Sequence, residues 1–309
     1  ELVVTIEEGE KLKARTIAFE GNAAFPDKEL RGKMKQSTGG FLKSATFKKQ
    51  QFEDDKERLA MWYRDHGFLD VEITDVDMTF VEENKKIDLL IHVSEGPVYT
   101  VGDINWEGNE EFDDLAVASR ILLERDDTFR EVDYQETLRI LHSLYWDNGY
   151  IYITVEPERQ IRGQVVDLTF RFREGEPAKI RDVRVVDNLK TYDEVILREM
   201  RLFPGDVFSN SLIELSQRNI FQLGYFNNVM PEFQPGDQEG DIDLVMKVEE
   251  KQTGQFSFGM AYSAQTSVTG FIQIAETNFR GKGQNIGLAW QFGARQRYVD
   301  INFTEPWFM

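Results

Sequence analysis

The chain has 309 residues, of which 41% are hydrophobic, and its 55 acidic residues outnumber 36 basic ones to give a net charge of −19. A surface of that sign repels phosphate backbones, which argues against nucleic-acid binding. The absence of cysteine excludes disulfides and thiolate metal sites. This length and hydrophobic content are typical of several small domains, each with its own core.

No run approaches the roughly 18 apolar residues of a membrane-spanning helix. The first residues also lack the basic and apolar segments of a secretory signal. We therefore expect either that a targeting peptide has been removed or that the chain is an internal piece of a longer protein.

One stretch of sequence recurs along the chain. An alternating apolar segment, Ile87–Val93, is followed by Glu95-Gly96 and then by Gly108-Asn109. The same order appears 79 residues further on, in residues 167–188, and 87 residues earlier, in residues 2–22; a last copy, residues 242–250, lacks the glycine. Constant offsets of this kind indicate tandem structural repeats.

The expected elements come in the same order within each unit. Apolar residues two apart, which share one face of a strand, predict an opening strand; the pairs are Ile17 and Phe19, Ile104 and Trp106, and Val183 and Val185. A polar stretch that favours two helices follows. The second helix ends at a glycine suited to the left-handed conformation that stops a helix; these glycines are Gly67, Gly149 and Gly224.

A second strand is expected directly after each glycine. It is marked by Leu69, Val71 and Ile73 in one unit and by Ile151, Ile153 and Val155 in the next, and a third strand by Leu89, Ile91 and Val93. The order β-α-α-β-β predicts a three-stranded sheet that buries two helices on one face. Both outer strands of such a sheet remain open edges.

From residue 256 on, the pattern changes. Apolar residues alternate with small or polar ones at Phe256, Phe258, Met260 and Tyr262, and again at Ile286, Leu288, Trp290 and Phe292. Nearly uncharged strands of about ten residues are typical of a transmembrane β-barrel and unlike a soluble sheet. The sequence of residues 280–283, Arg-Gly-Lys-Gly, predicts a hairpin turn rather than a phosphate loop, because no helix follows it.

The repeated unit resembles the POTRA (polypeptide-transport-associated) repeat, and the tail resembles the opening of the barrel in the family of bacterial outer-membrane assembly factors. The tail motifs are residues 250–259 (Glu-Lys-Gln-Thr-Gly-Gln-Phe-Ser-Phe-Gly), residues 276–283 (Glu-Thr-Asn-Phe-Arg-Gly-Lys-Gly) and residues 302–308 (Asn-Phe-Thr-Glu-Pro-Trp-Phe). One departure is Asp187, which stands where Gly21 and Gly108 stand in the other units.

The resemblance implies an α+β fold of tandem β-α-α-β-β POTRA repeats, followed by the first antiparallel strands of an incomplete transmembrane β-barrel. The expected parts are the end of a preceding repeat in residues 1–9, repeats in residues 10–96, 97–176 and 177–250, and barrel strands in residues 251–309. The tail has room for only about four strands, whereas bacterial barrels need about eight or more.

By the same resemblance, the family inserts barrel proteins into the outer membrane without ATP, with its repeats in the periplasm. The implied partners are unfolded outer-membrane barrel proteins as clients, periplasmic chaperones, accessory lipoproteins on the last repeat, and outer-membrane lipid; no cofactor is implied. Alternatives with the same architecture are a two-partner secretion transporter and an organelle import barrel. A soluble acidic scaffold of repeats is a further alternative.

We expect client segments to add as a strand to the open edges, because backbone pairing accepts many side chains. The candidate edge residues are Asp70, Val71, Glu72, Ile73, Thr74, Asp75, Ile151, Tyr152, Ile153, Thr154, Val155 and Glu156. The first barrel strand resembles the one that opens sideways in the family to pair with a client's terminal strand, and it comprises Phe256, Ser257, Phe258, Gly259, Met260, Ala261 and Tyr262.

We expect that the chain is not an enzyme. Its three histidines, His66, His92 and His142, lie in different parts of the units and lack the spacing of metal ligands. No nucleophile elbow or phosphate loop is present.

Overall fold

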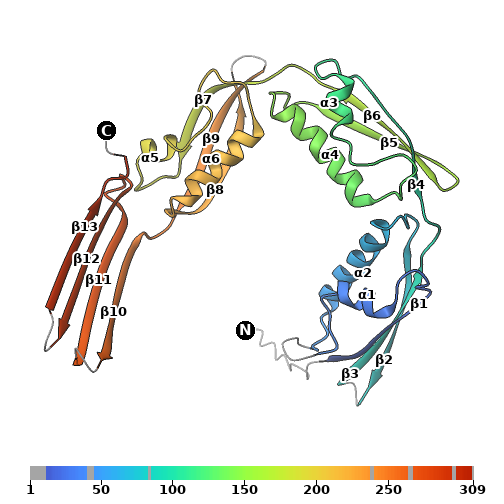
Figure 1. The fold of residues 1–309 in the computed structure, drawn as a ribbon, viewed down its shortest axis with the longest axis horizontal. Helices are drawn as coiled ribbons and strands as arrows, with labels where there is room; N and C mark the ends of the chain where they lie inside the picture. The colour runs from blue at the N-terminus through green and yellow to red at the C-terminus, as the bar shows by residue number, and fades with distance from the viewer. Residues whose placement is uncertain are drawn as a thin grey trace, which may run out of the picture. The chain divides into compact units, whose positions relative to one another are not determined.

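A computed structural model describes residues 12–39, 45–82, 85–236, 240–263, 267–293 and 297–307 (Figure 1). The chain divides into two compact units, residues 1–142 with 154–173 and residues 143–153 with 174–309. The expected end of a preceding repeat, residues 1–9, lies outside the described residues.

The first repeat has its elements in the predicted order. They are β1 (Lys13–Glu20), α1 (Asp27–Lys33), α2 (Lys49–Arg64), β2 (Glu72–Val81) and β3 (Lys86–Ser94). The middle strand is β3, which runs parallel to β1 and antiparallel to β2. Ile87, Leu89 and Ile91 of β3 are fully buried, because alternate residues of this strand face the two helices.

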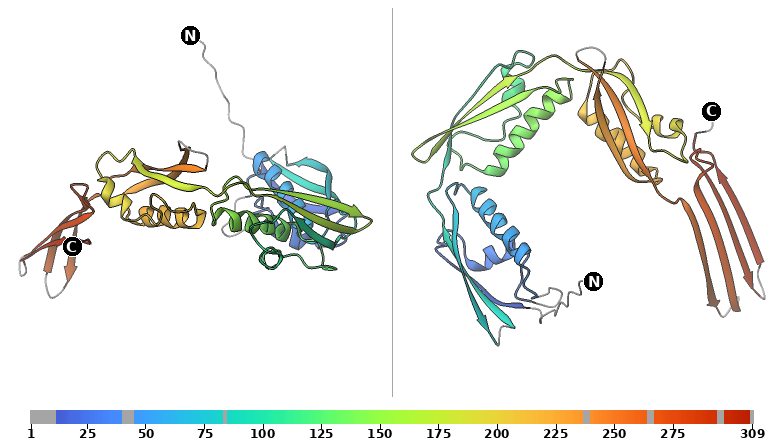
Figure 2. Two further views of the ribbon diagram at one scale, coloured as in Figure 1. Left: turned by 90° about the horizontal axis from the view of Figure 1, so that it is seen from above. Right: turned by 180° about the vertical axis from the view of Figure 1, so that it is seen from behind.

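Two further repeats have the same order. The second consists of β4 (Thr100–Glu107), α3 (Asp114–Ala118), α4 (Glu131–Trp146), β5 (Thr154–Arg162) and β6 (Val165–Arg173). The third consists of β7 (Lys179–Val186), α5 (Asp193–Leu197), α6 (Asn210–Gln222), β8 (Phe226–Pro235) and β9 (Asp241–Glu250). The long helices lie on one face of their sheets (Figure 2), and β6 and β9 are the middle strands. The predicted α+β order of tandem β-α-α-β-β units is confirmed.

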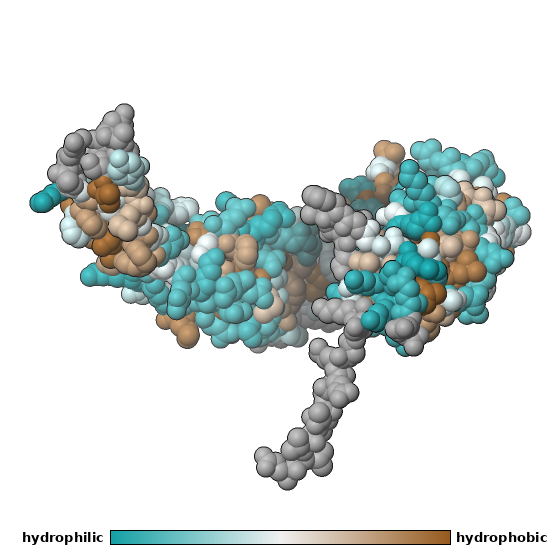
Figure 3. Space-filling view, turned by 90° about the horizontal axis from the view of Figure 1, so that it is seen from below, coloured by the Kyte–Doolittle hydropathy of each residue, from teal (hydrophilic) through white to brown (hydrophobic). Residues whose placement is uncertain are grey.

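The tail forms an open sheet of four antiparallel strands in chain order. They are β10 (Gly254–Ser263), β11 (Ser267–Phe279), β12 (Gln284–Gly293) and β13 (Arg297–Thr304). Phe258, Ile272 and Trp290 lie opposite one another across three strands, so the middle of one face of the sheet is apolar. The tail is accordingly browner than the repeats in Figure 3. The described strands close no barrel, in keeping with the predicted incomplete set.

An aspartate near the start of each middle strand accepts hydrogen bonds from the first strand, beside an irregularity in that strand. The aspartates are Asp88, Asp167 and Asp243, and the donors are Arg15 Nε (2.9 Å), the N–H of Asp103 (2.8 Å) and Arg181 Nε (2.7 Å), respectively. These bonds favour the charged carboxylates, so the pKa of each aspartate is lowered. Each aspartate thus fastens a first strand, across its irregularity, to the middle strand.

The glycine that ends each second helix has a positive φ, as predicted: +89° at Gly67, +96° at Gly149 and +76° at Gly224. The first two glycines also join successive repeats. The carbonyl of Gly67 accepts a hydrogen bond from the N–H of Tyr99, and that of Gly149 from the N–H of Ala178, both at 2.8 Å. The residue that stops one repeat's helix therefore also anchors the start of the next repeat.

An aspartate two residues before Gly67, and another two residues before Gly149, caps a helix of the following repeat. Asp65 Oδ1 accepts the N–H of Val132 in the first turn of α4 (2.9 Å), and Asp147 Oδ1 accepts the N–H of Ser211 in the first turn of α6 (2.7 Å). A carboxylate at a helix N-terminus satisfies a free N–H group and the helix dipole. The caps of these helices are therefore supplied by the preceding repeat.

The departure at Asp187 leaves the turn intact. Asp187 has a φ of +68°, close to the +85° and +84° of Gly21 and Gly108. Aspartate tolerates the left-handed conformation better than most residues that carry a side chain.

Alanine at the helix-ending glycines should separate the two roles of these residues. A Cβ at Gly224 would meet nothing within 4 Å, whereas one at Gly67 would lie 2.6 Å from Thr128 Cγ2 and one at Gly149 2.7 Å from Val207 Cγ1. We expect Gly224→Ala to cost about 1 kcal/mol of unfolding free energy from the positive φ alone. Gly67→Ala and Gly149→Ala should cost about 2–3 kcal/mol because overpacking is added. Urea unfolding measures these free energies. Equal losses at all three positions would contradict the role of Gly67 and Gly149 in joining successive repeats.

Acid should weaken the first repeat through Asp88. Hydrogen bonds from Arg15 and Thr16 lower the pKa of Asp88 to about 2. A carboxylate with a lowered pKa in the folded state stabilises the fold above its unfolded pKa, and that contribution is lost as the pH falls toward about 2. Asp88→Asn should therefore be less stable than wild type at pH 7 and lose less stability between pH 4 and pH 2 than wild type loses. Parallel acid-unfolding curves for the two proteins would refute this account.

Candidate functional site

The predicted edge residues lie at the starts of the second strands, but both strands begin later than predicted. Asp70 and Val71 lie in a turn before β2, and Ile151, Tyr152 and Ile153 lie in a turn before β5. The N–H of Val71 is bonded to the carbonyl of Phe68 (3.3 Å), and that of Ile153 to the carbonyl of Tyr150 (3.2 Å). These backbone groups close turns, so the strand edges comprise only Glu72–Asp75 and Thr154–Glu156 of the predicted ranges.

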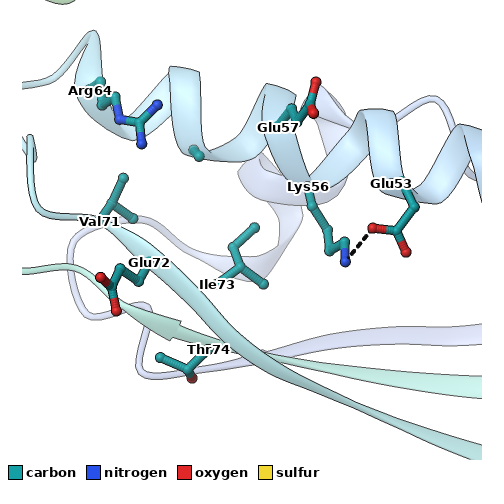
Figure 4. A pocket seen from close by; sticks show the side chains of 9 residues that line it. Glu53, Lys56, Glu57, Arg64, Val71, Glu72, Ile73 and Thr74 are labelled. Atoms are coloured by element: carbon teal, nitrogen blue, oxygen red, sulfur yellow. Dashed lines mark ion pairs between the residues drawn. The ribbon is translucent and has the colours of Figure 1, made fainter.

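A groove runs between helix α2 and the start of β2. It has a volume of about 630 Å³ and is lined by Glu53, Lys56, Glu57, Ala60, Arg64, Val71, Glu72, Ile73 and Thr74. Figure 4 shows Ile73 between the helix and the strand, with Lys56 paired to Glu53 on the helix. Charges of both signs therefore border a strip of apolar strand, an arrangement that fits an extended peptide.

Farther along β2, the face that looks toward the helices stays apolar although it reaches solvent. Met78 is 41% and Phe80 54% exposed, and they pair with the buried Leu89 and Ile87 of β3. No described strand pairs with the outer side of β2. The N–H of Val76 is bonded to the side chain of Asp75 (2.7 Å). This strand offers an open edge beside exposed apolar side chains.

The equivalent edge in the second repeat is obstructed. Pro157 of β5 pairs with Phe170, 79 residues after the Ile91 that pairs with Val76. Proline in an edge strand has no N–H to offer a further strand.

Arg159 of β5 is also tied to helix α4. Its guanidinium donates to both carboxylate oxygens of Glu131 (2.9 and 2.7 Å) and lies 3.7 Å from the centre of the Tyr134 ring. Arg159 pairs with Leu168, the counterpart of the Leu89 that pairs with Met78. A bidentate ion pair thus covers the apolar surface that β2 leaves exposed.

The third repeat is intermediate. A groove of about 310 Å³ beside β8 is lined by Gln217, Arg218, Phe221, Gln222, Asn228 and Val229. Gln217 Nε2 donates to the carbonyl of Val229 across this groove (2.6 Å). Two prolines, Pro231 and Pro235, lie in β8. β2 is therefore the one second strand without a proline.

The predicted first tail strand, residues 256–262, lies within β10. All ten residues of β10 pair with β11, from Gly254–Glu276 to Ser263–Ser267, and no described strand pairs with its other side. Phe256, Phe258, Met260 and Tyr262 are more than 60% exposed. The strand combines an open edge with an apolar face.

The described part of the chain was also compared with the requirements of a metal site and of a membrane-spanning helix. No group of three or more histidine, aspartate and glutamate side chains there is placed to hold a metal ion. Among the same residues, no helix has the length and hydropathy to cross a membrane.

Comparison with known proteins agrees with this geometry. The chain is 31% identical over 99% of its length to the "Putative outer membrane protein assembly factor" of Treponema pallidum. It is 29% identical over 99% of its length to the "Outer membrane protein assembly factor BamA" of Nitratidesulfovibrio vulgaris. It spans only 38% and 40% of these two relatives.

The fold matches a solved structure as well. The crystal structure of POTRA3-5 of BamA from Haemophilus influenzae covers 78% of this chain and 96% of its own, with a TM-score of 0.64 at 23% identity. The POTRA family model, described as "Surface antigen variable number repeat", matches residues 13–96, 99–175 and 178–251. The three repeats account for most of the sequence, and the chain belongs to the POTRA family.

Proposed function

We propose that this chain receives unfolded barrel proteins and passes them to the outer membrane, as part of an assembly factor. It is an outer-membrane protein whose repeats lie in the periplasm. The observation that carries the proposal is the outer edge of β2, which no described strand covers, which lacks proline, and which runs beside the groove and the exposed Met78 and Phe80. Backbone pairing at this edge accepts many client sequences, and the apolar strip favours their alternating apolar side chains.

The tail supplies the second half of the proposed function. We propose that β10–β13 are the first strands of a transmembrane barrel, that their apolar face contacts outer-membrane lipid, and that the open edge of β10 pairs with a client's terminal strand. Backbone hydrogen bonds and burial in lipid favour this transfer, so ATP is not required. Periplasmic chaperones deliver the clients, and the last repeat docks an accessory lipoprotein. A two-partner secretion or organelle import protein would use the same edges for other cargo.

Exchanging residues between β2 and β5 tests which edge receives clients. A photo-reactive amino acid at Thr79 in the full-length protein should crosslink to an unfolded barrel client. Val76→Pro copies Pro157 into β2 and should lower this crosslinking about fivefold, because the Val76 N–H could no longer exchange its bond to Asp75 for one to a client strand, and one net hydrogen bond is worth about 1 kcal/mol. Pro157→Val with Arg159→Met should instead raise crosslinking from Gln160, the β5 counterpart of Thr79. Unchanged crosslinking in both exchanges, with normal urea unfolding, would reject the edge assignment.

The apolar strip of β2 should contribute to affinity. Burying the exposed half of Phe80 is worth about 1–1.5 kcal/mol, so Phe80→Asp should weaken the binding of a client peptide about tenfold. Leu115→Asp is the matched control, since Leu115 is 77% exposed on α3 and the added charge is the same. Fluorescence anisotropy measures both affinities, and equal effects of the two substitutions would mean that charge alone is responsible.

A further inference from the structure

The loop between β7 and α5 lies against the turn between β11 and β12. The N–H of Tyr192 in the loop donates to the carbonyl of Gly281 in the turn (2.9 Å). Gly281 has a φ of +74°, and a Cβ there would lie 1.9 Å from the carbonyl oxygen of Lys190. The turn that the sequence identified as a simple hairpin is therefore shaped to accept residues 188–192.

Two buried polar side chains join the loop to the turn. Thr191 is 3% and Asn278 1% exposed. Asn278 Nδ2 donates to Thr191 Oγ1, and Asn278 Oδ1 accepts the N–H of Gly283, both at 2.8 Å. If the loop separated from the turn before water could enter, these buried polar groups would lose their partners. An unpaired buried polar group costs free energy, so the docked arrangement is favoured.

The same loop holds the start of β10. The N–H groups of Lys190 and Thr191 donate to the carboxylate of Glu250, the last residue of β9. Lys190 Nζ lies 3.1 Å from Thr253 Oγ1 and 3.2 Å from Glu276 Oε2, and the Thr253 hydroxyl donates to Glu276. Only residues 251–253 separate β9 from β10, so both ends of this short linker are bonded to the loop or its neighbours.

We infer that the loop of residues 188–192 and the turn of residues 278–283 form a docking joint that fixes the last repeat against the tail sheet, with Thr191 and Asn278 as positioning residues. The inference rests on the proposed function: the docked joint sets the position of the open edge of β10 when a client is bound to the repeats. The side chains of the joint lie outside the proposed client-binding edge of β2. The joint therefore affects the position of β10 and leaves the client-binding edge unchanged. Its loss should slow insertion without weakening client binding.

The test compares two substitutions at one position in the full-length protein in liposomes. Thr191→Val keeps the shape but removes the acceptor of Asn278, and Thr191→Ser keeps the hydroxyl. Spin labels at Arg218→Cys on α6 and Gln291→Cys on β12 report docking, and this chain contributes no other cysteine. Lys190→Met is a second variant at a half-exposed position, where folding is not at risk. Insertion of an unfolded barrel client and crosslinking from Thr79 are measured on the same samples.

We expect Thr191→Val to raise the undocked population about tenfold, since the docked state would then bury Asn278 Nδ2 without its acceptor. Insertion should slow with unchanged crosslinking from Thr79, Lys190→Met should show the same effects more weakly, and Thr191→Ser should match wild type. Label distances unchanged in both Thr191→Val and Lys190→Met would overturn the joint. Altered distances with wild-type insertion would overturn its role in positioning. A wild-type protein that does not crosslink clients would instead refute the proposed function on which the inference rests.

Discussion

In a three-stranded sheet, only the middle strand has its backbone N–H and C=O groups paired on both sides, and every repeat of this chain is built around that constraint. The middle strands β3, β6 and β9 carry the buried residues on which the helices pack. The outer strands must either block their unpaired side or use it. Pro157 and the pair of Arg159 with Glu131 obstruct β5, whereas β2 has neither device. The repeats therefore share one fold and differ in the residues of their edge strands.

Helix ends impose a second constraint, because the first N–H and last C=O groups of a helix have no partner within it. Between the repeats, the chain satisfies such groups across the junction. The carbonyl of Gly67 and the carboxylate of Asp65 both bond to the second repeat, and Gly149 and Asp147 repeat this arrangement one unit later. The last repeat contacts the tail differently, through the side chains of Thr191 and Asn278. Each junction between repeats thus combines a backbone hydrogen bond with an aspartate that caps a helix, and the joint to the tail combines a backbone hydrogen bond with two buried side chains.

Much of this architecture could be read from local patterns. Two features depend on residues that are close together in the chain, and the sequence predicts both. They are the positive φ of the helix-ending glycines and the alternation of apolar residues along β3 and β10. The strands β2 and β5 begin later than the sequence predicts, because the apolar residues after each glycine have the alternation of a strand. Val71 and Ile153 are indeed buried, but they fill the core from a turn. Burial alone does not distinguish a strand from a turn that packs against the core.

Two further features have a signature in the sequence. Asp65 and Asp147, which cap helices of the following repeats, stand two residues before matched glycines, and Pro157 lies in a predicted edge strand. The pairing of Arg159 with Glu131 and of Thr191 with Asn278 had no such signal, since the partners lie 28 and 87 residues apart. Periodicity and backbone conformation are local properties, so the sequence is enough to predict the repeats, their helix stops and the apolar face of the tail. Which edge stays open and how the last repeat is held depend on the distant side chains that folding brings within hydrogen-bonding distance, so these features are evident only in the folded chain.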